Sequence, residues 1–179
     1  MTFENNKCGK QVAGQTSGEH SHPDWLAALR IYFSVIAVGN LFWETVHLPL
    51  YILWNTGSTG EKIFAVAHCT AGDLLIALCS LMLALMTGGD RDWPARRFKT
   101  VAAITLLLGI AYTAFSEWLN IVARKSWAYS ELMPVIDVFG FDVGVSPLLQ
   151  WIVIPALALW RSRRKAFARR QPALIKTSR

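Results

Sequence analysis

Four long stretches of this sequence contain no lysine or arginine, and none holds more than one acidic residue. An apolar helix of about 20 residues crosses the hydrocarbon core of a bilayer. The first three stretches reach that length, and the shorter fourth begins at Ser146 and Pro147, a favourable helix start. The scarcity of charge therefore predicts an all-α integral membrane four-helix bundle. Residues 25–160 would form this single domain, with spans at about residues 31–54, 63–86, 101–122 and 147–160.

Cysteine is also scarce, and the usual nucleotide and zinc-protease signatures are missing. The chain has three cysteines and no CxxC pair, which argues against a disulfide-exchange enzyme. It contains no Walker loop, GxGxxG or HExxH motif. Whether the protein is an enzyme stays open, and no residue is assigned a catalytic role.

Positive charge is scarce in two of the connections between spans. Of the 18 Lys and Arg residues, the connections at 55–62 and 123–146 hold only Lys62, Arg124 and Lys125. Because Lys and Arg are retained on the cytoplasmic side, both termini are predicted to be cytoplasmic. Residues 1–24 would form a polar tail and residues 161–179 a basic tail. This distribution explains the net charge of +6 by membrane topology, so no nucleic-acid partner is expected. Trp54, Trp118, Trp127 and Trp151 would form an aromatic belt at the outer interface.

Polar residues inside the apolar stretches fall on helical stripes. In the first stretch they recur at i, i+4, i+7 and i+11, and in the third they repeat this spacing. The two stripes are Asn40, Glu44, His47 and Tyr51, and Thr113, Glu117, Asn120 and Arg124. Lipid offers such groups no hydrogen-bond partners, so we expect the stripes to face a shared interior.

Counting residues from the span ends places several polar side chains at one depth near the outer leaflet. His47, His68, Glu117 and Gln150 belong to this layer, whereas Asp73 lies closer to the midplane. Glu44 and His47 have the ExxH spacing that carboxylate-bridged di-iron bundles use. We therefore hypothesise a zinc or iron site, or a site for another first-row metal, with Glu44, His47, His68 and Glu117 as ligands. The groups expected to orient these ligands are Asn40, Tyr51, Asn120, Tyr129 and Gln150.

Other interpretations of the same residues stay open. His47 and His68 could ligate a b-type haem, although adjacent helices joined by a short loop would sit close together for that. A small lipophilic molecule could enter sideways if the apolar connection 123–146 folds back as a lid; alternatively this connection lies along the membrane interface. A proton- or ion-coupled transporter would use Asp73 in a relay and, at this size, would have to form a homo-oligomer. A structural or accessory subunit would use the polar groups only for helix register.

Several segments together resemble a known group of proteins. They are WETVHLPLY, HCTAGDLLIA, SEWLN, WAYSELMP and VGVSPLLQW, which lie between about Trp43 and Pro155. This set is similar to small four-span bacterial inner-membrane proteins with no assigned function. The resemblance implies the four-span topology and a bacterial inner-membrane location, and it implies no particular chemistry.

Overall fold

The computed structural model describes residues 24–168, and four long helices make up most of this part. They are α1 (Trp25–His47), α3 (Thr59–Gly88), α4 (Phe98–Glu117) and α5 (Val145–Ala168). The shorter elements are the 3₁₀ helix η1 (Leu48–Leu50), α2 (Leu53–Thr56), the π-helix η2 (Trp118–Ala123) and the strands β1 (Val135–Val138) and β2 (Phe141–Gly144). The predicted tails 1–24 and 161–179 lie largely outside the described residues.

All four predicted spans correspond to helices that are long and apolar enough to cross a membrane. With their continuations they cover Trp25–Leu50, Thr59–Gly88, Phe98–Ala123 and Val145–Ala166. The fourth extends beyond the predicted 147–160, because long arginine side chains can continue a helix while their charged ends reach toward the interface. The four apolar helices indicate a membrane protein.

The first span ends earlier than the sequence predicted. Helix α1 stops at His47, and the chain passes through η1 before α2, so residues 51–54 do not continue the first helix. The physical reason is Pro49, which has no N–H group to continue the hydrogen bonds of α1 and whose ring clashes with the preceding turn. Tyr51 consequently does not extend the stripe of Asn40, Glu44 and His47, although those three are all buried on one face of α1.

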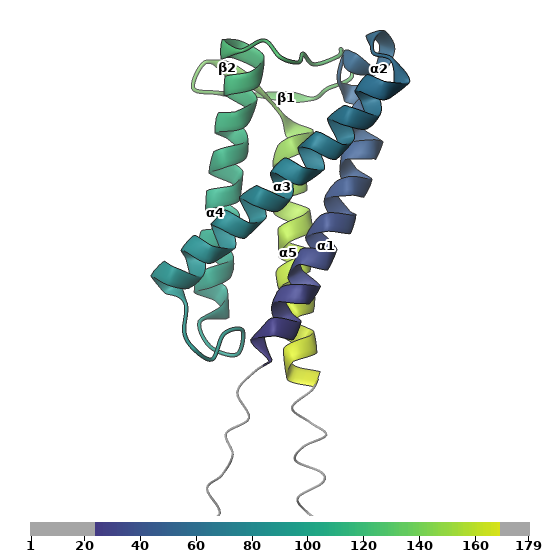
Figure 1. Ribbon diagram of the computed structural model, residues 1–179. Helices are drawn as coiled ribbons and strands as arrows, with labels where there is room; N and C mark the ends of the chain where they lie inside the picture. The colour runs from purple at the N-terminus through teal and green to yellow at the C-terminus, as the bar shows by residue number, and fades with distance from the viewer. Residues whose placement is uncertain (1–23, 169–179) are drawn as a thin grey trace, which may run out of the picture.

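The helices form a ring in which α1 contacts α3 and α5, while α4 contacts the same two helices from the other side. Helices α1 and α4 are therefore diagonal to one another. We call one end of the bundle the basic end; there α1 begins, α5 ends and α3 connects to α4 (Figure 1). It carries the described cations Arg30, Arg91, Arg96, Arg97, Lys99, Arg161, Arg163, Arg164 and Lys165. The opposite end, with α2 and the β1–β2 hairpin, is the capped end.

Small residues allow close helix contacts toward the basic end and the middle of the bundle. A Cβ atom added at Gly88 would lie 2.8 Å from Ile104 Cδ1, and one added at Gly109 would lie 2.2 Å from Trp151 Cε3. These glycines let α3 approach α4 and let α4 approach α5. Helix α3 runs obliquely across the bundle, from beside α4 at the basic end to beside α1 at the capped end (Figure 1).

The connection between α4 and α5 folds back over the capped end, which is one of the two placements that the sequence left open. Ile52 N donates to Ala128 O over 3.0 Å, and Ser130 N donates to Leu50 O over 2.9 Å. Tyr51 and Tyr129 form an isolated antiparallel bridge. The antiparallel β1–β2 hairpin was not predicted, because its two strands have only four residues each.

Candidate functional site

A cavity of about 760 Å³ lies among the four long helices, beneath the 124–144 segment, which we call the cap. Its volume is within the range of small-molecule sites, which is roughly 300–1,000 Å³. Leu75 and Leu83 of α3 and Leu108, Tyr112 and Phe115 of α4 line it, and all five are substantially exposed. The cavity thus opens between α3 and α4, on a side of the bundle that faces lipid if these helices span a membrane.

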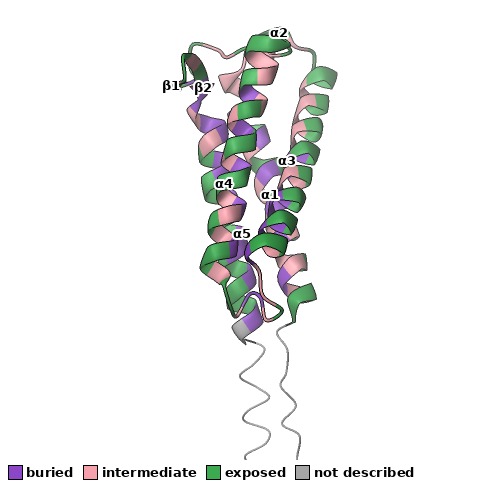
Figure 2. Ribbon diagram, turned by 90° about the vertical axis from the view of Figure 1, so that its left-hand side faces the viewer, coloured by how far each residue is buried: buried purple, intermediate pink, exposed green. Residues whose placement is uncertain are grey.

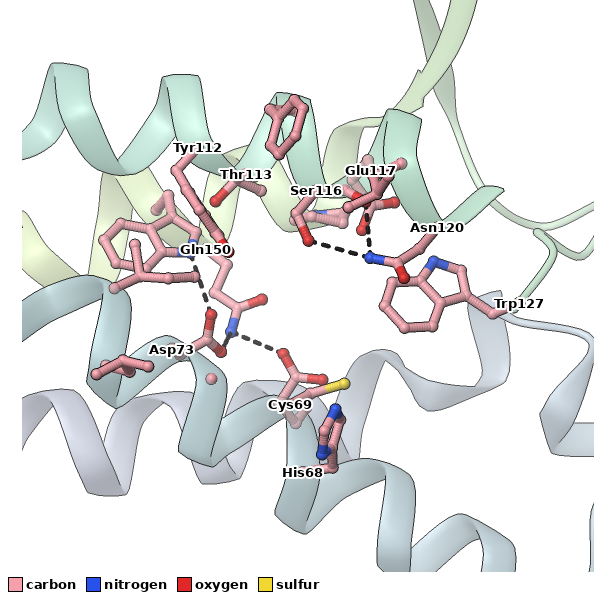
Figure 3. Close-up of a pocket in the computed structure, with 18 of the residues that line it drawn as sticks. His68, Cys69, Asp73, Tyr112, Thr113, Ser116, Glu117, Asn120, Trp127 and Gln150 are labelled. Atoms are coloured by element: carbon pink, nitrogen blue, oxygen red, sulfur yellow. Dashed lines mark hydrogen bonds between the residues drawn. The ribbon is translucent and has the colours of Figure 1, made fainter. Parts of the chain in front are cut away.

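The amide of Gln150 is the centre of a buried polar cluster in the cavity wall. Its Nε2 atom lies 2.9 Å from each of three acceptors, Asn40 Oδ1, Glu44 Oε1 and Asp73 Oδ2. These residues come from α1, α3 and α5, and Figure 3 shows Gln150 reaching toward Asp73. An amide carries two N–H donors, so three acceptors must share them. The two carboxyl groups are therefore held close to one nitrogen and to each other.

Asp73 has a second donor on α5. Trp151 Nε1 donates to Asp73 Oδ1 over 3.2 Å, and the Trp151 ring fills the space that Gly109 leaves open. Trp151 is only 2% exposed. The sequence prediction that it belongs to an interfacial belt is therefore wrong, since its indole N–H is needed by a buried carboxylate.

His47 uses both of its ring nitrogens within the protein. Nε2 lies 3.1 Å from Glu44 Oε2, one helical turn away, and Nδ1 lies 3.0 Å from Ser146 Oγ at the start of α5. Trp43 Nε1 donates to the same Ser146 oxygen over 3.1 Å. The helical spacing that suggested a shared face for Glu44 and His47 thus produces a direct contact between them.

The Glu117 carboxyl group is bonded by a residue of the cap. The Tyr129 hydroxyl donates to Glu117 Oε2 and accepts from Gly144 N over 2.7 Å. Burial raises the pKa of the Tyr129 phenol, and the neighbouring Glu117 carboxyl raises it further. The phenol therefore keeps its proton at neutral pH and serves as the donor that joins the cap to α4.

The π-helix η2 begins immediately after Glu117. π-Helical turns are rare and occur frequently at functional sites. Here the turn carries Leu119 and Asn120 along the cavity wall toward its capped end. The Asn120 amide donates to Ser116 O over 2.8 Å and to Ser116 Oγ over 3.3 Å. Asn120 is thus satisfied within its own helix and does not orient the predicted metal ligands.

Two groups lining the cavity lack a hydrogen-bond partner among the described residues. They are Thr113 Oγ1, on a residue that is 6% exposed, and Trp127 Nε1. A helical threonine can satisfy itself on a carbonyl one turn back, as Thr105 does on Val101. Thr113 forgoes that bond, so its hydroxyl is available to a bound molecule.

The four predicted metal ligands are not brought together. Glu44 and His47 are in contact, whereas Glu117 bonds to Tyr129 and His68 is exposed and stacks on Phe64 at 5.5 Å between ring centroids. In the described part of the chain, no group of three or more His, Cys, Asp or Glu side chains is arranged to hold a metal ion. The metal and haem interpretations remain predictions without support from this arrangement.

The residues assigned to orient those ligands have mixed roles. Gln150 donates to both Asn40 and Glu44, and Tyr129 contacts Glu117. The Tyr51 side chain only packs its ring against His47 and Tyr129. Sequence reasoning did not predict that Ser146 contacts His47, or that Trp151 is buried in the bundle. For Trp151 the available signal was Gly109, a small residue on the buried stripe of α4, but pairing it with one tryptophan requires the packing of two helices.

Comparisons with known proteins leave the site to be interpreted from its own geometry. No protein-family model, no curated protein and no solved structure matches this chain. The cavity, the Gln150 cluster and the two unpaired groups are therefore the features of the chain that bear on function. They belong to a membrane protein of four apolar helices with buried acidic residues.

Proposed function

We propose that this protein binds a small lipophilic molecule that carries a polar group and enters sideways from the bilayer. The cavity itself carries the proposal: its mouth is apolar and its inner wall holds Glu44, Asp73 and Glu117. Apolar pockets with a few convergent polar groups are the usual form of small-molecule sites. The tail of the ligand would lie between α3 and α4, and its polar group would face the Gln150 cluster.

The structure of the cap favours entry of the ligand from the bilayer over entry from water. Backbone bonds from Ile52 and Ser130 and the Tyr129 hydroxyl bond fasten the 124–144 segment across the capped end. The mouth between α3 and α4 instead exposes leucine and aromatic side chains. A molecule dissolved in the bilayer would reach the cavity through this mouth without breaking the cap.

The same geometry gives less support to a proton relay through the membrane. Glu44 and Asp73 both lie beside the Gln150 amide, and a relay through the membrane would have to continue from them toward the basic end. Toward the basic end, the core contains Tyr32, Ile36, Leu81, Ala84 and Val101. Tyr32 is the one titratable side chain in this set, so the set offers no chain of titratable groups.

The test of ligand binding is photolabelling with a matched pair of cavity variants. A Cβ atom added at Gly72, beside Asp73 in the cavity wall, meets no atom within 4 Å. Gly72→Phe should therefore fill the cavity without forcing α3 apart. Gly60→Phe makes the same change on α3 outside the cavity and serves as the control.

The probe is an alkyl alcohol bearing a diazirine and an alkyne in its tail, added to the protein in nanodiscs. We expect saturable labelling of α3 and α4 residues at the mouth in the parent and in Gly60→Phe, and at least about a tenfold loss in Gly72→Phe. Ala111→Trp, which fills the cavity from α4, should give the same loss. Labelling that does not saturate, or that ignores both cavity variants, would refute the proposal.

We also propose that the basic end is cytoplasmic, in a bacterial inner membrane. The cations of that end support this orientation through the retention of Lys and Arg. Phe139 is 99% exposed at the hairpin tip and Arg91 is exposed at the basic end. In a Cys8→Ser background, a membrane-impermeant maleimide should label Phe139→Cys on intact spheroplasts and Arg91→Cys only after lysis. The Cys8→Ser parent controls for labelling of Cys69 and Cys79. The opposite labelling pattern would show that the capped end, and not the basic end, is cytoplasmic.

A further inference from the structure

The three acidic residues of the cavity have no permanent cationic partner among the described residues. Asp73 accepts from the uncharged N–H groups of Trp151 and Gln150. Glu117 accepts from the Tyr129 phenol. Glu44 contacts His47, which is charged only when it is protonated. A charged carboxylate deep in a bilayer is energetically costly unless it is neutralised, so this site favours binding of a positive charge.

Aromatic rings in the cavity wall favour the same kind of ligand. Tyr51, Tyr112, Phe115, Trp127 and Trp151 line the cavity together with the acidic residues. The face of an aromatic ring attracts an ammonium group, most strongly where water is excluded. Arg124 also lines the cavity, but it is exposed beyond the end of η2 and forms no ion pair with the acids in the described region.

The unpaired Thr113 hydroxyl is an independent sign of a missing polar partner. It lies on the α4 wall, and Figure 3 shows it on the same side of the cavity as Glu117, across from Asp73 of α3. A hydroxyl oxygen can accept a hydrogen bond from an ammonium N–H. An ammonium group has three donors, which suits acceptors on the facing walls of the cavity.

We infer that the bound molecule is a lipophilic amine, held as an ammonium ion by Asp73 and Glu44 with Thr113 as a further acceptor. The inference rests on the proposed function, because it specifies the polar group of the same ligand. The ammonium ion would replace the missing cation of the acidic cluster. Its apolar part would remain in the mouth between α3 and α4, in contact with lipid.

The experiment compares two photoprobes that share one diazirine and alkyne tail and differ only in ending as a primary amine or a primary alcohol. At neutral pH in nanodiscs, the amine should reach half-saturation of the labelling at a concentration at least about tenfold lower than the alcohol. Asp73→Asn should reduce that preference to within about threefold. Asp142→Asn, an acid exposed on β2, should leave the preference unchanged.

Thr113→Val separates ligand binding from folding. Because the hydroxyl has no partner in the described protein, the variant should keep its melting temperature while amine labelling weakens by about fivefold, the value of one hydrogen bond. Thr105→Val is the matched control on α4, since Thr105 is fully buried and bonds only to its own helix. This pair stays informative if Asp73→Asn does not fold.

The outcomes separate the inference from the proposed function. Equal half-saturation for amine and alcohol, with both blocked by Gly72→Phe, would overturn the amine assignment and leave the lipophilic site in place. It would mean that protons neutralise the acids. Absence of saturable labelling by either probe would overturn both proposals. An amine preference that survives Asp73→Asn and Glu44→Gln would also contradict the inference, because these two carboxyl groups would then not bind the ammonium group.

Discussion

In the two halves of the bundle, the same buried helix faces carry different kinds of side chain. On α1 the buried face contains Ala28, Tyr32 and Ile36 near the basic end, and then Asn40, Glu44 and His47 near the capped end. On α4 the same face changes from Val101 through Gly109 to Glu117. In Figure 2 buried positions follow both helices along their length. The change is thus one of chemistry along a continuous buried face.

The halves also differ in how closely α3 approaches α4. At the basic end Gly88 lies against Thr100 and Ile104, whereas toward the capped end the cavity separates the helices. Gly72, on the same helix, borders open space. A bundle that needed only stability would close along its whole length, because each unfilled cavity forfeits packing energy. The open half is therefore the part of the molecule in which we place function.

The largest expected effect comes from placing the same side chain in each half of the bundle. Gly109→Leu forces atoms into the Trp151 ring, and overpacking of this degree should cost more than about 3 kcal/mol and lower the melting temperature strongly. Gly72→Leu adds the side chain to the cavity and should change stability by less than about 1 kcal/mol. Thermal melting in detergent, followed by tryptophan fluorescence, measures both variants. Similar losses would show that the cavity is closed in the membrane-extracted protein.

An intermediate effect is expected at the polar centre of the open half. Gln150→Leu leaves Asn40, Glu44 and Asp73 without their common donor, and an unsatisfied buried acceptor costs on the order of 1–3 kcal/mol. Asn120→Leu is the control, because the Asn120 amide bonds only to Ser116. We expect the first variant to melt at a clearly lower temperature and the second to melt near the parent. A stabilised Gln150→Leu would instead mean that the acids are neutral and need no donor.

The smallest effect is expected at the cap. Tyr129→Phe removes the hydroxyl that joins Glu117 to Gly144 N, which should cost about 1 kcal/mol and act locally. Hydrogen exchange at residues 135–144 should become faster while exchange in α1 and α5 stays slow. Tyr51→Phe keeps the ring contacts of Tyr51, whose hydroxyl makes no hydrogen bond to the described residues, and should leave exchange unchanged. Faster exchange throughout the bundle would show that the cap holds the helices and is not a local cover.

Sequence periodicity predicted the helices better than it predicted their partners. The stripe of Asn40, Glu44 and His47 was correct because helical spacing alone decides which residues share a face. His68 was assigned to the same layer from its depth, but depth along a helix does not determine direction around it. In the structure His68 is an exposed residue of the cavity lining and stacks on Phe64, and it forms no hydrogen bond with the other predicted ligands in the described region.

Sequence alone determined the four apolar helices, the concentration of cations at one end and the burial of polar residues inside the spans. These follow from local properties, namely the free energy of moving side chains into lipid and the 3.6-residue helical repeat. Only the tertiary structure decided that Gln150 joins Asn40, Glu44 and Asp73, that Trp151 turns inward to Asp73, and that α3 diverges from α4. Such contacts depend on crossing angles and close approaches between distant segments, and no single helix encodes them.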